Sequence, residues 1–356
     1  MDDVEVLRAL VEAYSPSGAE TEAVDRFLEL ARDLGLSVES DAAGNGIARI
    51  GTGPPAILFL GHIDTVEGEL PVRVTEDRLY GRGACDAKGP LAAALIAASH
   101  HRGSGRITIV AAVGEERDSR GARHLLTQFS RPDFLIIGEP SGWDAATIGY
   151  KGNLSMVLRI QGTRSHLSSP DATTVEEGLT LVDQLRRYLE GRRASTSFAS
   201  PSLKIHSINS ALRGGTDEVE IAVNVRLPPG LPAEDVLTFI EGAEPKVRCE
   251  VIDRSQAVEV DPKNEVVRAL CAGIRALGAR PTLLRKSGTS DLNVVEPVWS
   301  CPAAAYGPGD SHLDHTDAEH ILIEDFRRAV KVLEIAFSRL AALHPPALPE
   351  AAGRVA

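Results

Sequence analysis

The sequence predicts an α/β fold whose sheet is covered by helices on both faces and is interrupted by an inserted α+β module. Two patterns favour this class. Short apolar runs alternate with helical stretches up to about residue 150, and segments of alternating polar and apolar residues follow. The chain also has 356 residues, which is more than one hydrophobic core usually holds, so two domains are expected.

Three apolar runs are typical of buried strands: AILFLGHID at 56–64, ITIVAAVGEE at 107–116 and DFLIIGEP at 133–140. The stretches between these runs favour helices. KGPLAAALIAASHH at 88–101 has a proline suited to a first helical turn and alanines through its interior. A second helix is expected from about 119 to 129.

The pattern changes near Tyr150. GYKGNLSMVLRIQG alternates in places as a half-exposed strand does, and a helix is expected over 173–191. SLKIHSIN and DEVEIAVNVRLPPG then alternate clearly, with one face formed by Val219, Ile221, Val223 and Val225. This pattern predicts an antiparallel sheet with helices on one side.

We therefore expect a split domain formed by residues 1–150 and 262–345, and an inserted domain formed by residues 151–261. The insertion ends near AVEVDPKNE, and a helix over about 264–276 returns to the first domain. The Pro- and Ala-rich tail at 346–356 is expected to be disordered.

The composition argues against several classes of protein. A net charge of −12 argues against a nucleic-acid partner, because phosphate binding needs a basic face. Cys85, Cys249, Cys271 and Cys301 form no CxxC pair, so a reducing cytosol is favoured over a disulfide framework or a zinc knuckle. No apolar run approaches the roughly 20 residues of a membrane span, and the acidic amphipathic N-terminus is unlike a signal peptide.

Each of the three apolar runs ends in polar side chains. His62 and Asp64 end the first run, Glu115 and Glu116 end the second, and Glu139 ends the third. In open α/β sheets, ligands lie outside the carboxyl ends of the strands. We therefore expect these side chains to meet in one crevice.

Two further residues complete a candidate set of metal ligands. Asp86 lies in RGACDAKGP before a predicted helix, and His315 lies in DSHLDHTDAEH near the end of the chain. Together with His62, Glu116 and Glu139 they form an oxygen and nitrogen donor set that suits Zn²⁺, Co²⁺ or Mn²⁺ rather than a thiolate site. Two ions about 3.5–4 Å apart need one shared carboxylate, and the short side chain of Asp86 suits that role.

The residues beside the ligands suggest further roles. His62 and Asp64 are two positions apart in an extended segment, so they face the same side and Asp64 can orient the imidazole ring. Glu115 and Glu116 are adjacent and point apart in an extended chain. That arrangement suits one glutamate to ligate an ion and the other to accept a proton from water.

Each feature has a structural alternative when it is taken singly. A histidine and an aspartate at a strand end commonly form a polar turn, paired glutamates commonly end a strand in solvent, and Asp86 is also placed to cap a helix. His312 and His320 compete with His315. No GxGxxG, GxSxG or P-loop pattern offers a different chemistry. The joint occurrence of these residues, in order and at strand ends, favours the metal site.

Five segments resemble, in order, the motifs of the dinuclear zinc aminoacylase and carboxypeptidase family: GHIDTV, GRGACDAKGPLAA, GEERDSRGA, IGEPSG and YGPGDSHLDHTDAEHI. That family includes acetylornithine deacetylase and succinyl-diaminopimelate desuccinylase. The resemblance implies a metallopeptidase-type α/β catalytic domain, here the split domain, with an inserted ferredoxin-like α+β lid and dimerisation domain. It also implies two divalent ions per chain, either Zn²⁺ or Co²⁺.

The resemblance also assigns roles to the candidate residues. It implies five ligands shared between two ions: His62, Asp86 and Glu139 for one ion, and Asp86, Glu116 and His315 for the other. Glu115 corresponds to the general base. Asp64 corresponds to the carboxylate behind His62.

The inserted domain carries further points of resemblance. YKGNLSMVLRIQGTRSHLSSP resembles the start of the family's lid, in which a histidine, here His166, reaches the active site of the partner subunit. In the family that histidine helps to hold the developing oxyanion. The resemblance therefore implies a homodimer.

Substrate contacts are also implied by resemblance. GGTDEVEIAVNVRLPPG resembles the lid segment with a substrate-contacting arginine, here Arg226. KSGTSDLNVV resembles the loop that holds the substrate carboxylate, which makes Ser287, Gly288 and Thr289 candidates. The family's asparagine-rich stretch before the arginine is replaced by INSALRGGTDE, in which Asn209 is the candidate.

Within this family, GHIDTV, RLYGRGACDAKGPLAA, DSRGAR, IGEPSGW and IGYKG look closest to the hydrolases that release lysine, and in some cases ornithine, from an amino-group carrier protein. The bond cut there joins the side chain of the carrier's terminal glutamate to the α-amine of the amino acid. The resemblance implies a cytoplasmic biosynthetic enzyme whose partner is the loaded carrier. An N-acetylornithine deacetylase, a succinyl-diaminopimelate desuccinylase and a metal-free binding homologue are the alternatives.

Overall fold

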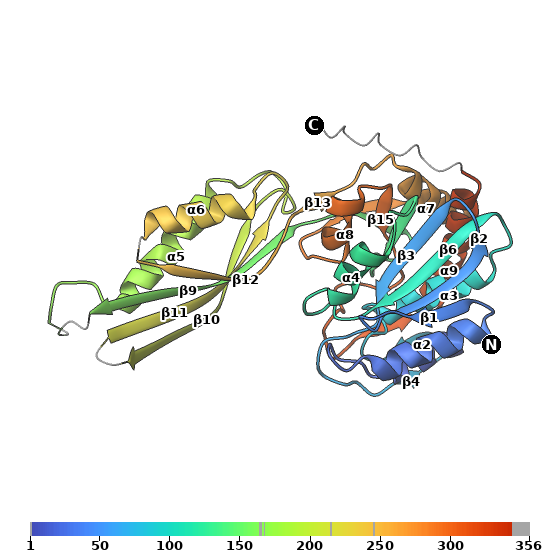
Figure 1. Ribbon diagram of the computed structural model, residues 1–356, viewed down its shortest axis with the longest axis horizontal. Helices are drawn as coiled ribbons and strands as arrows, with labels where there is room; N and C mark the ends of the chain where they lie inside the picture. The colour runs from blue at the N-terminus through green and yellow to red at the C-terminus, as the bar shows by residue number, and fades with distance from the viewer. Residues whose placement is uncertain (1, 164–165, 167, 214–215, 245, 344–356) are drawn as a thin grey trace. The chain divides into compact units, whose positions relative to one another are not determined.

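The computed structural model describes residues 2–163, 166, 168–213, 216–244 and 246–343. Its helices and strands group by their contacts into two compact units (Figure 1). The first unit contains the described residues of Met1–Ile148, Val260–Leu284 and Val294–Ala356, and the second contains those of Gly149–Glu259 and Arg285–Asn293. The tail at 346–356, for which disorder is expected, lies outside the described residues.

The first unit is built on a mixed sheet with the strand order β1-β2-β6-β3-β7-β15-β8. The three predicted apolar strands are its centre: β3 (Ala56–His62), β6 (Gly105–Ala112) and β7 (Phe134–Gly138). β3 lies between the other two and is parallel to both, so the carboxyl ends of all three meet at one edge. The other strands are β1 (Ser37–Ser40), β2 (Gly46–Thr52), β8 (Ala145–Tyr150), β14 (Thr282–Lys286), which pairs with β8, and β15 (Ala303–Ala305).

Helices pack against this sheet as the α/β class predicts. α3 (Lys88–Ser99) and α9 (Ile323–Ala341) contact β3 and β6, and α7 (Glu265–Ala276) contacts β7 and β15. The remaining helices outside the inserted segment are α1 (Asp3–Glu12), α2 (Thr21–Asp33), α4 (Arg120–Gln128) and α8 (Leu292–Trp299). The helices expected over 88–101, 119–129 and 264–276 are confirmed.

Helix α3 comes unusually close to the sheet. Every one of its residues is buried, which its run of alanines permits. Gly61 of β3 lies under it, and a Cβ atom at that position would be 2.9 Å from Leu91 Cδ2. The N-cap of α3 is Ala87, so Asp86 does not cap this helix and its side chain is available for other contacts.

A small three-stranded sheet joins distant parts of the first unit. Its strands follow the order β16 (His320–Leu322), β5 (Arg78–Tyr80) and β4 (Arg73–Val74). β16 is antiparallel to β5, with His320 opposite Tyr80. This pairing brings the segment after residue 310 alongside the segment before residue 88.

The second unit has the ferredoxin-like βαββαβ order that was predicted. Its elements are β9 (Gly152–Thr163), α5 (Thr174–Glu190), β10 (Ser202–Arg213), β11 (Thr216–Leu227), α6 (Ala233–Ala243) and β12 (Arg248–Ser255). The sheet is antiparallel with the order β10-β11-β9-β12. The predicted face of Val219, Ile221, Val223 and Val225 is at most 1% exposed and forms one core with residues of α5 and α6.

Two paired strand segments lie where the chain enters and leaves this unit. The last residues of β8 pair with β13 (Val258–Glu259), with Tyr150 opposite Val258 and Gly149 opposite Glu259. The loop Arg285–Asn293 also groups with the second unit by its contacts. The second unit is thus formed by two separate segments of the chain.

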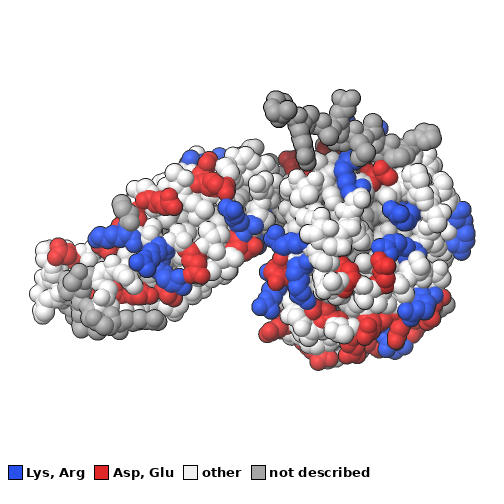
Figure 2. All heavy atoms as spheres, in the orientation of Figure 1, with Lys and Arg blue, Asp and Glu red and all other residues white. Residues whose placement is uncertain are grey.

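Charges of both signs are interspersed on the face of each unit that Figure 2 shows. Many charges pair locally, as Arg8 does with Glu5 and Glu12 on α1. Exposed pairs of this kind contribute at most about 1 kcal/mol each, so they do not determine the fold. Within the described ranges, no helix is both long and apolar enough to cross a membrane.

Replacing Gly61 by alanine tests the close packing of α3. The added Cβ meets Leu91, so we expect Gly61→Ala to lower the free energy of unfolding by about 1–3 kcal/mol. Gly242→Ala in α6 is the control, because nothing lies within 4 Å of its added Cβ, and it should raise stability by up to about 1 kcal/mol. Urea unfolding followed by circular dichroism measures both. Wild-type stability of Gly61→Ala would contradict this packing.

Candidate metal centre

The carboxyl ends of three parallel strands bring the predicted polar residues together. His62 is the last residue of β3 and is 2% exposed. Glu115 and Glu116 follow β6, and Glu139 directly follows β7 and is 8% exposed. Because the strands themselves are almost wholly buried, the main chain that carries these residues is firmly held.

The carboxylate of Asp86 lies between two imidazole rings. Its Oδ1 is 3.2 Å from His62 Nε2, and its Oδ2 is 3.1 Å from His315 Nε2. His315 Nε2 is also 2.9 Å from Glu116 Oε1, and His62 Nε2 is 4.0 Å from Glu139 Oε1. One carboxylate thus faces both histidines, and each histidine faces a further glutamate.

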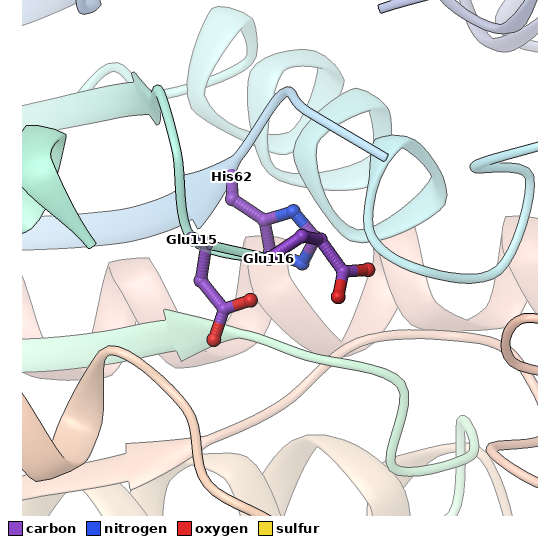
Figure 3. A group of neighbouring side chains, drawn as sticks. All are labelled: His62, Glu115 and Glu116. Carbon is purple, nitrogen blue, oxygen red and sulfur yellow. The ribbon is translucent and has the colours of Figure 1, made fainter. Parts of the chain in front are cut away.

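Two groups of side chains have ligand atoms close enough to share an ion. One is His62, Glu115 and Glu116, and the other is Asp86, Glu116 and His315, with the ligand atoms of each group within 4.8 Å of one another. Figure 3 shows His62 at the end of its strand and the two glutamate side chains leaving the neighbouring loop in different directions. Adjacent glutamates therefore present carboxylates at two points of one site.

The cluster favours positive charge. Hydrogen bonds to Asp86 and Glu116 raise the pKa of His315 to about 10. Burial alone would lower the pKa of His62, but hydrogen bonds to Asp64 and Asp86 outweigh it and raise this pKa well above its usual value. Burial would raise the pKa of Asp86, yet the two histidines lower it. The same negative potential that raises the pKa of the histidines also favours a divalent cation. The oxygen and nitrogen atoms of these side chains are suitable ligands for such an ion.

His315 reaches the cluster from a left-handed backbone conformation. Its φ is 63°, which few residues other than glycine adopt. The side chain of His312 is 93% exposed and bonds to Asp310, and His320 Nδ1 lies 2.7 Å from the carbonyl oxygen of Ala318. Of these three histidines, His315 is the one that the structure brings into the cluster.

Asp64 holds the loop that carries the two glutamates. Its side chain is fully buried, Oδ1 accepts the backbone N–H of Glu115 at 3.0 Å, and Oδ2 accepts that of Glu116 at 3.1 Å. His62 Nδ1 lies 2.9 Å from the backbone carbonyl oxygen of Asp64 and 3.6 Å from its Oδ1. The carbonyl of Asp64 therefore makes the shorter contact with the ring, while its carboxylate fixes the loop of Glu115 and Glu116.

Ser17 is a contact that sequence reasoning did not identify. Its hydroxyl donates to Asp64 Oδ2 at 2.6 Å, across 47 positions of sequence. Ser17 lies in the segment SPSG between α1 and α2, and by itself this segment has the composition of an ordinary turn. The hydroxyl is a further donor to the buried carboxylate, beside the N–H groups of Glu115 and Glu116.

In the second unit, the half-buried Arg226 and the buried Lys151 place two cationic groups near the predicted substrate contact Thr289. Arg226 Nη1 is 3.5 Å from Thr289 Oγ1, and burial lowers the pKa of Arg226. Lys151 is 2% exposed and donates to the carbonyl oxygen of Ser200 at 2.6 Å. Burial, and then the charge of Arg226, lower the pKa of Lys151. Positive charge held away from water in this way favours an anion nearby.

The other residues predicted in the second unit are exposed. Ser287 and Gly288 lie on the surface of the loop before Thr289. Asn209 lies on the edge strand β10 opposite Glu220, well along that strand from the residue that pairs with Arg226, so the structure does not bring it beside this arginine. His166 is also exposed, with its Nδ1 2.7 Å from Ser168 Oγ.

Residues 58–339 match Peptidase family M20/M25/M40. The chain belongs to this family. A relative from Thermococcus kodakarensis is 39% identical over 335 residues, which cover 93% of this chain and 90% of the relative. The LysW-lysine hydrolase of Deinococcus radiodurans is 38% identical over 352 residues, covering 94% and 96% of the two chains. The LysW-lysine/LysW-ornithine hydrolase of Saccharolobus solfataricus is 28% identical, covering 94% and 95%.

Solved structures of family members share the fold. Aminopeptidase PepT of Bacillus cereus has a TM-score of 0.78 at 18% identity, covering 95% of this chain and 98% of its own. The YXEP protein of Bacillus subtilis, a dinuclear metal-binding peptidase of family M20, has a TM-score of 0.67 at 14% identity, covering 95% and 96%. At these identities the likeness establishes the fold alone. The α/β catalytic fold with an inserted α+β domain is thereby confirmed.

Removing and restoring metal tests the cation site. We expect chelator-treated protein to unfold at a lower temperature than protein with Zn²⁺ or Co²⁺, because an ion bound only by the folded state stabilises it. At a free ion concentration of 100 times the Kd, the gain is about 2.7 kcal/mol. Differential scanning fluorimetry across an ion titration measures the shift.

Matched histidine variants control this measurement. His315→Ala should lose part of the shift, because its ring contacts Asp86 and Glu116, whereas the exposed His312→Ala should keep all of it. Equal shifts in the two variants would show that His315 binds no ion.

Proposed function

We propose that this chain is a metal-dependent hydrolase that cleaves the amide bond joining L-lysine, and also L-ornithine, to an amino-group carrier protein. The observation that carries the proposal is the cluster of acidic and imidazole side chains at the ends of β3, β6 and β7, in a chain 38% identical to a LysW-lysine hydrolase. The enzyme would act in lysine biosynthesis and, through ornithine, in arginine biosynthesis, in the cytoplasm.

Five residues are proposed to hold two ions: His62, Asp86 and Glu139 for one, and Asp86, Glu116 and His315 for the other. The position of Asp86 between the two imidazoles supports its role as the shared ligand. Zn²⁺ is the proposed ion, with Co²⁺ as the alternative. Such ions, when bound, supply Lewis-acid polarisation of the amide carbonyl and make water a stronger acid.

Glu115 is proposed as the general base. Asp64 accepts its backbone N–H, and its side chain leaves the loop in a different direction from that of Glu116 (Figure 3). It takes a proton from the water whose oxygen attacks the amide carbon. It then gives that proton to the leaving α-amine as the carbon–nitrogen bond breaks, so the carboxylate ends the cycle as it began.

The second unit is proposed to bind the substrate. Arg226 and Thr289 would receive the carboxylate of the amino acid, with Ser287 and Gly288 in the same loop. The half-buried charge of Arg226 and the buried charge of Lys151 support this role.

Two exposed residues complete the proposal. His166 would stabilise the developing oxyanion in the site of a second subunit, which makes the protein a homodimer. Asn209 is proposed as a further substrate contact on the basis of its place in the family's lid segment.

Replacing the base tests the mechanism. Glu115→Gln keeps the size of the side chain but removes its ability to accept a proton, so we expect kcat to fall by about 10²–10⁴-fold. The metal content, measured by mass spectrometry, should stay near that of the wild type. Glu67→Gln, an exposed position after β3, is the control and should leave both quantities unchanged. Full activity of Glu115→Gln would make the assignment of the base wrong.

A panel of substrates tests the specificity. Carrier-linked lysine, carrier-linked ornithine, N-acetylornithine and N-succinyl-diaminopimelate should be assayed side by side, and we expect the highest kcat/KM for carrier-linked lysine. A preference for N-acetylornithine would contradict the carrier but keep the amide hydrolase. Absence of hydrolysis together with absence of bound metal would indicate a binding homologue instead.

A further inference from the structure

Arg82 and Glu319 form a buried ion pair beside the candidate ligands but outside their set. Arg82 Nη1 donates to Glu319 Oε2 at 2.9 Å, and the side chains are 5% and 1% exposed. Taking two charges out of water carries a desolvation penalty that their attraction offsets only in part, so a buried pair explains little stability by itself. The other contacts of the two groups are therefore the informative ones.

Glu319 binds the backbone of the loop that carries Asp86. Its Oε1 accepts the N–H of Cys85 at 3.0 Å and that of Asp86 at 3.2 Å. The backbone carbonyl of Glu319 also accepts the N–H of Gly81 at 3.3 Å. The carboxylate of Glu319 thus fixes the point from which the Asp86 side chain projects toward the two imidazoles.

Arg82 binds two other loops of the same unit. Its Nη1 donates to the carbonyl oxygen of Thr316 at 3.0 Å, and its Nε donates to that of Gly68 at 2.9 Å. Thr316 directly follows His315, whose left-handed backbone aims the imidazole into the cluster. One guanidinium therefore holds both the turn of His315 and the loop that follows Asp64. It can do so because its several N–H donors point in fixed directions from one plane.

We infer that Arg82 and Glu319 are a positioning pair that fixes Asp86 against His315 and thereby sets the affinity for a divalent ion held between them. Asp86 and His315 are 229 positions apart, and their side chains meet at 3.1 Å. The pairing of β16 with β5 brings the two segments alongside each other. The ion pair of Arg82 and Glu319 then holds the loops that carry Asp86 and His315, next to these strands. The inference rests on the proposed metal site.

Two variants separate charge from geometry. Glu319→Gln keeps an acceptor oxygen for the N–H groups of Cys85 and Asp86, but it leaves the charge of Arg82 without compensation. Arg82→Lys keeps the charge, but a single ammonium group cannot reach Glu319 and both carbonyl oxygens along the directions of the guanidinium fork. The first variant disturbs the loop of Asp86, and the second chiefly disturbs the turn of His315.

The ion pair of Arg120 with Glu20 is the matched control. Arg120 Nη2 lies 2.7 Å from Glu20 Oε1, the Glu20 side chain is 5% exposed, and the pair lies in the same unit. Neither group has a hydrogen bond to Asp86 or His315. Glu20→Gln therefore disturbs a buried carboxylate without disturbing the proposed ligands.

The experiment measures metal affinity directly. Each metal-free protein is titrated with Zn²⁺, and separately with Co²⁺, in competition with a chromophoric chelator. We expect two ions per chain for the wild type and for Glu20→Gln. For each ion, the dissociation constants of these two proteins should lie within threefold of each other. Glu319→Gln and Arg82→Lys should each weaken at least one ion by tenfold or more. For Arg82→Lys, this should be the same ion that His315→Ala loses, and excess metal should restore activity.

The free energy of unfolding of each metal-free variant is measured beside its metal affinity. The two measurements together distinguish a positioning role from a merely structural one. Wild-type affinity for both ions in Glu319→Gln and Arg82→Lys would overturn the inference, whatever the loss of stability. If Glu319→Gln does not fold, Arg82→Lys decides the question in the same way. Failure of both to fold beside a folded Glu20→Gln would also count against positioning. A wild type that binds no ion would refute the proposed function itself.

Discussion

Two imidazoles that share one carboxylate are the arrangement on which the site depends. Asp86 contacts His62 and His315 through its two oxygens, and three glutamates lie close to the same rings. Carboxylates held this close repel one another unless positive charge lies between them, and the raised pKa of both histidines reflects that need. The fold must therefore hold negative groups together before any ion arrives.

Two buried carboxylates outside the proposed set of ligands hold the backbone of the loops that carry the acidic residues of the site. Asp64 accepts the N–H groups of Glu115 and Glu116, and Glu319 accepts those of Cys85 and Asp86. In both cases a buried carboxylate receives two consecutive peptide N–H groups of a loop next to the cluster. Such charge-assisted bonds satisfy backbone donors that the end of a strand or the start of a helix leaves without a partner.

Much of the fold could be predicted because its signals are local. The apolar runs of β3, β6 and β7 and the alternation of β11 are periodic patterns within a few residues, and polar residues mark the strand ends. The edge of the sheet at which the site lies follows from that pattern. Which residues bind ions and which residue accepts a proton stay predictions.

The contacts that support the site could not be predicted in the same way. Ser17 meets Asp64 across 47 positions, and Arg82 meets Glu319 across 237. Locally Ser17, Arg82 and Glu319 resemble ordinary turn or surface residues, and these contacts arise only when distant loops meet. Spacing alone likewise did not separate His315 from its neighbours, because that choice depended on a resemblance to a family motif.

The pairing of Tyr150 with Val258 and of Gly149 with Glu259 has a consequence for how such a chain can change over time. Antiparallel strands can be joined by a turn of two residues, so the larger segment of the second unit, between Tyr150 and Val258, occupies the place of a hairpin loop. A segment inserted at such a point can be lengthened, shortened or exchanged while the ladder at its base stays intact. Selection can therefore remodel the inserted unit independently of the edge of the sheet that gathers the acidic side chains.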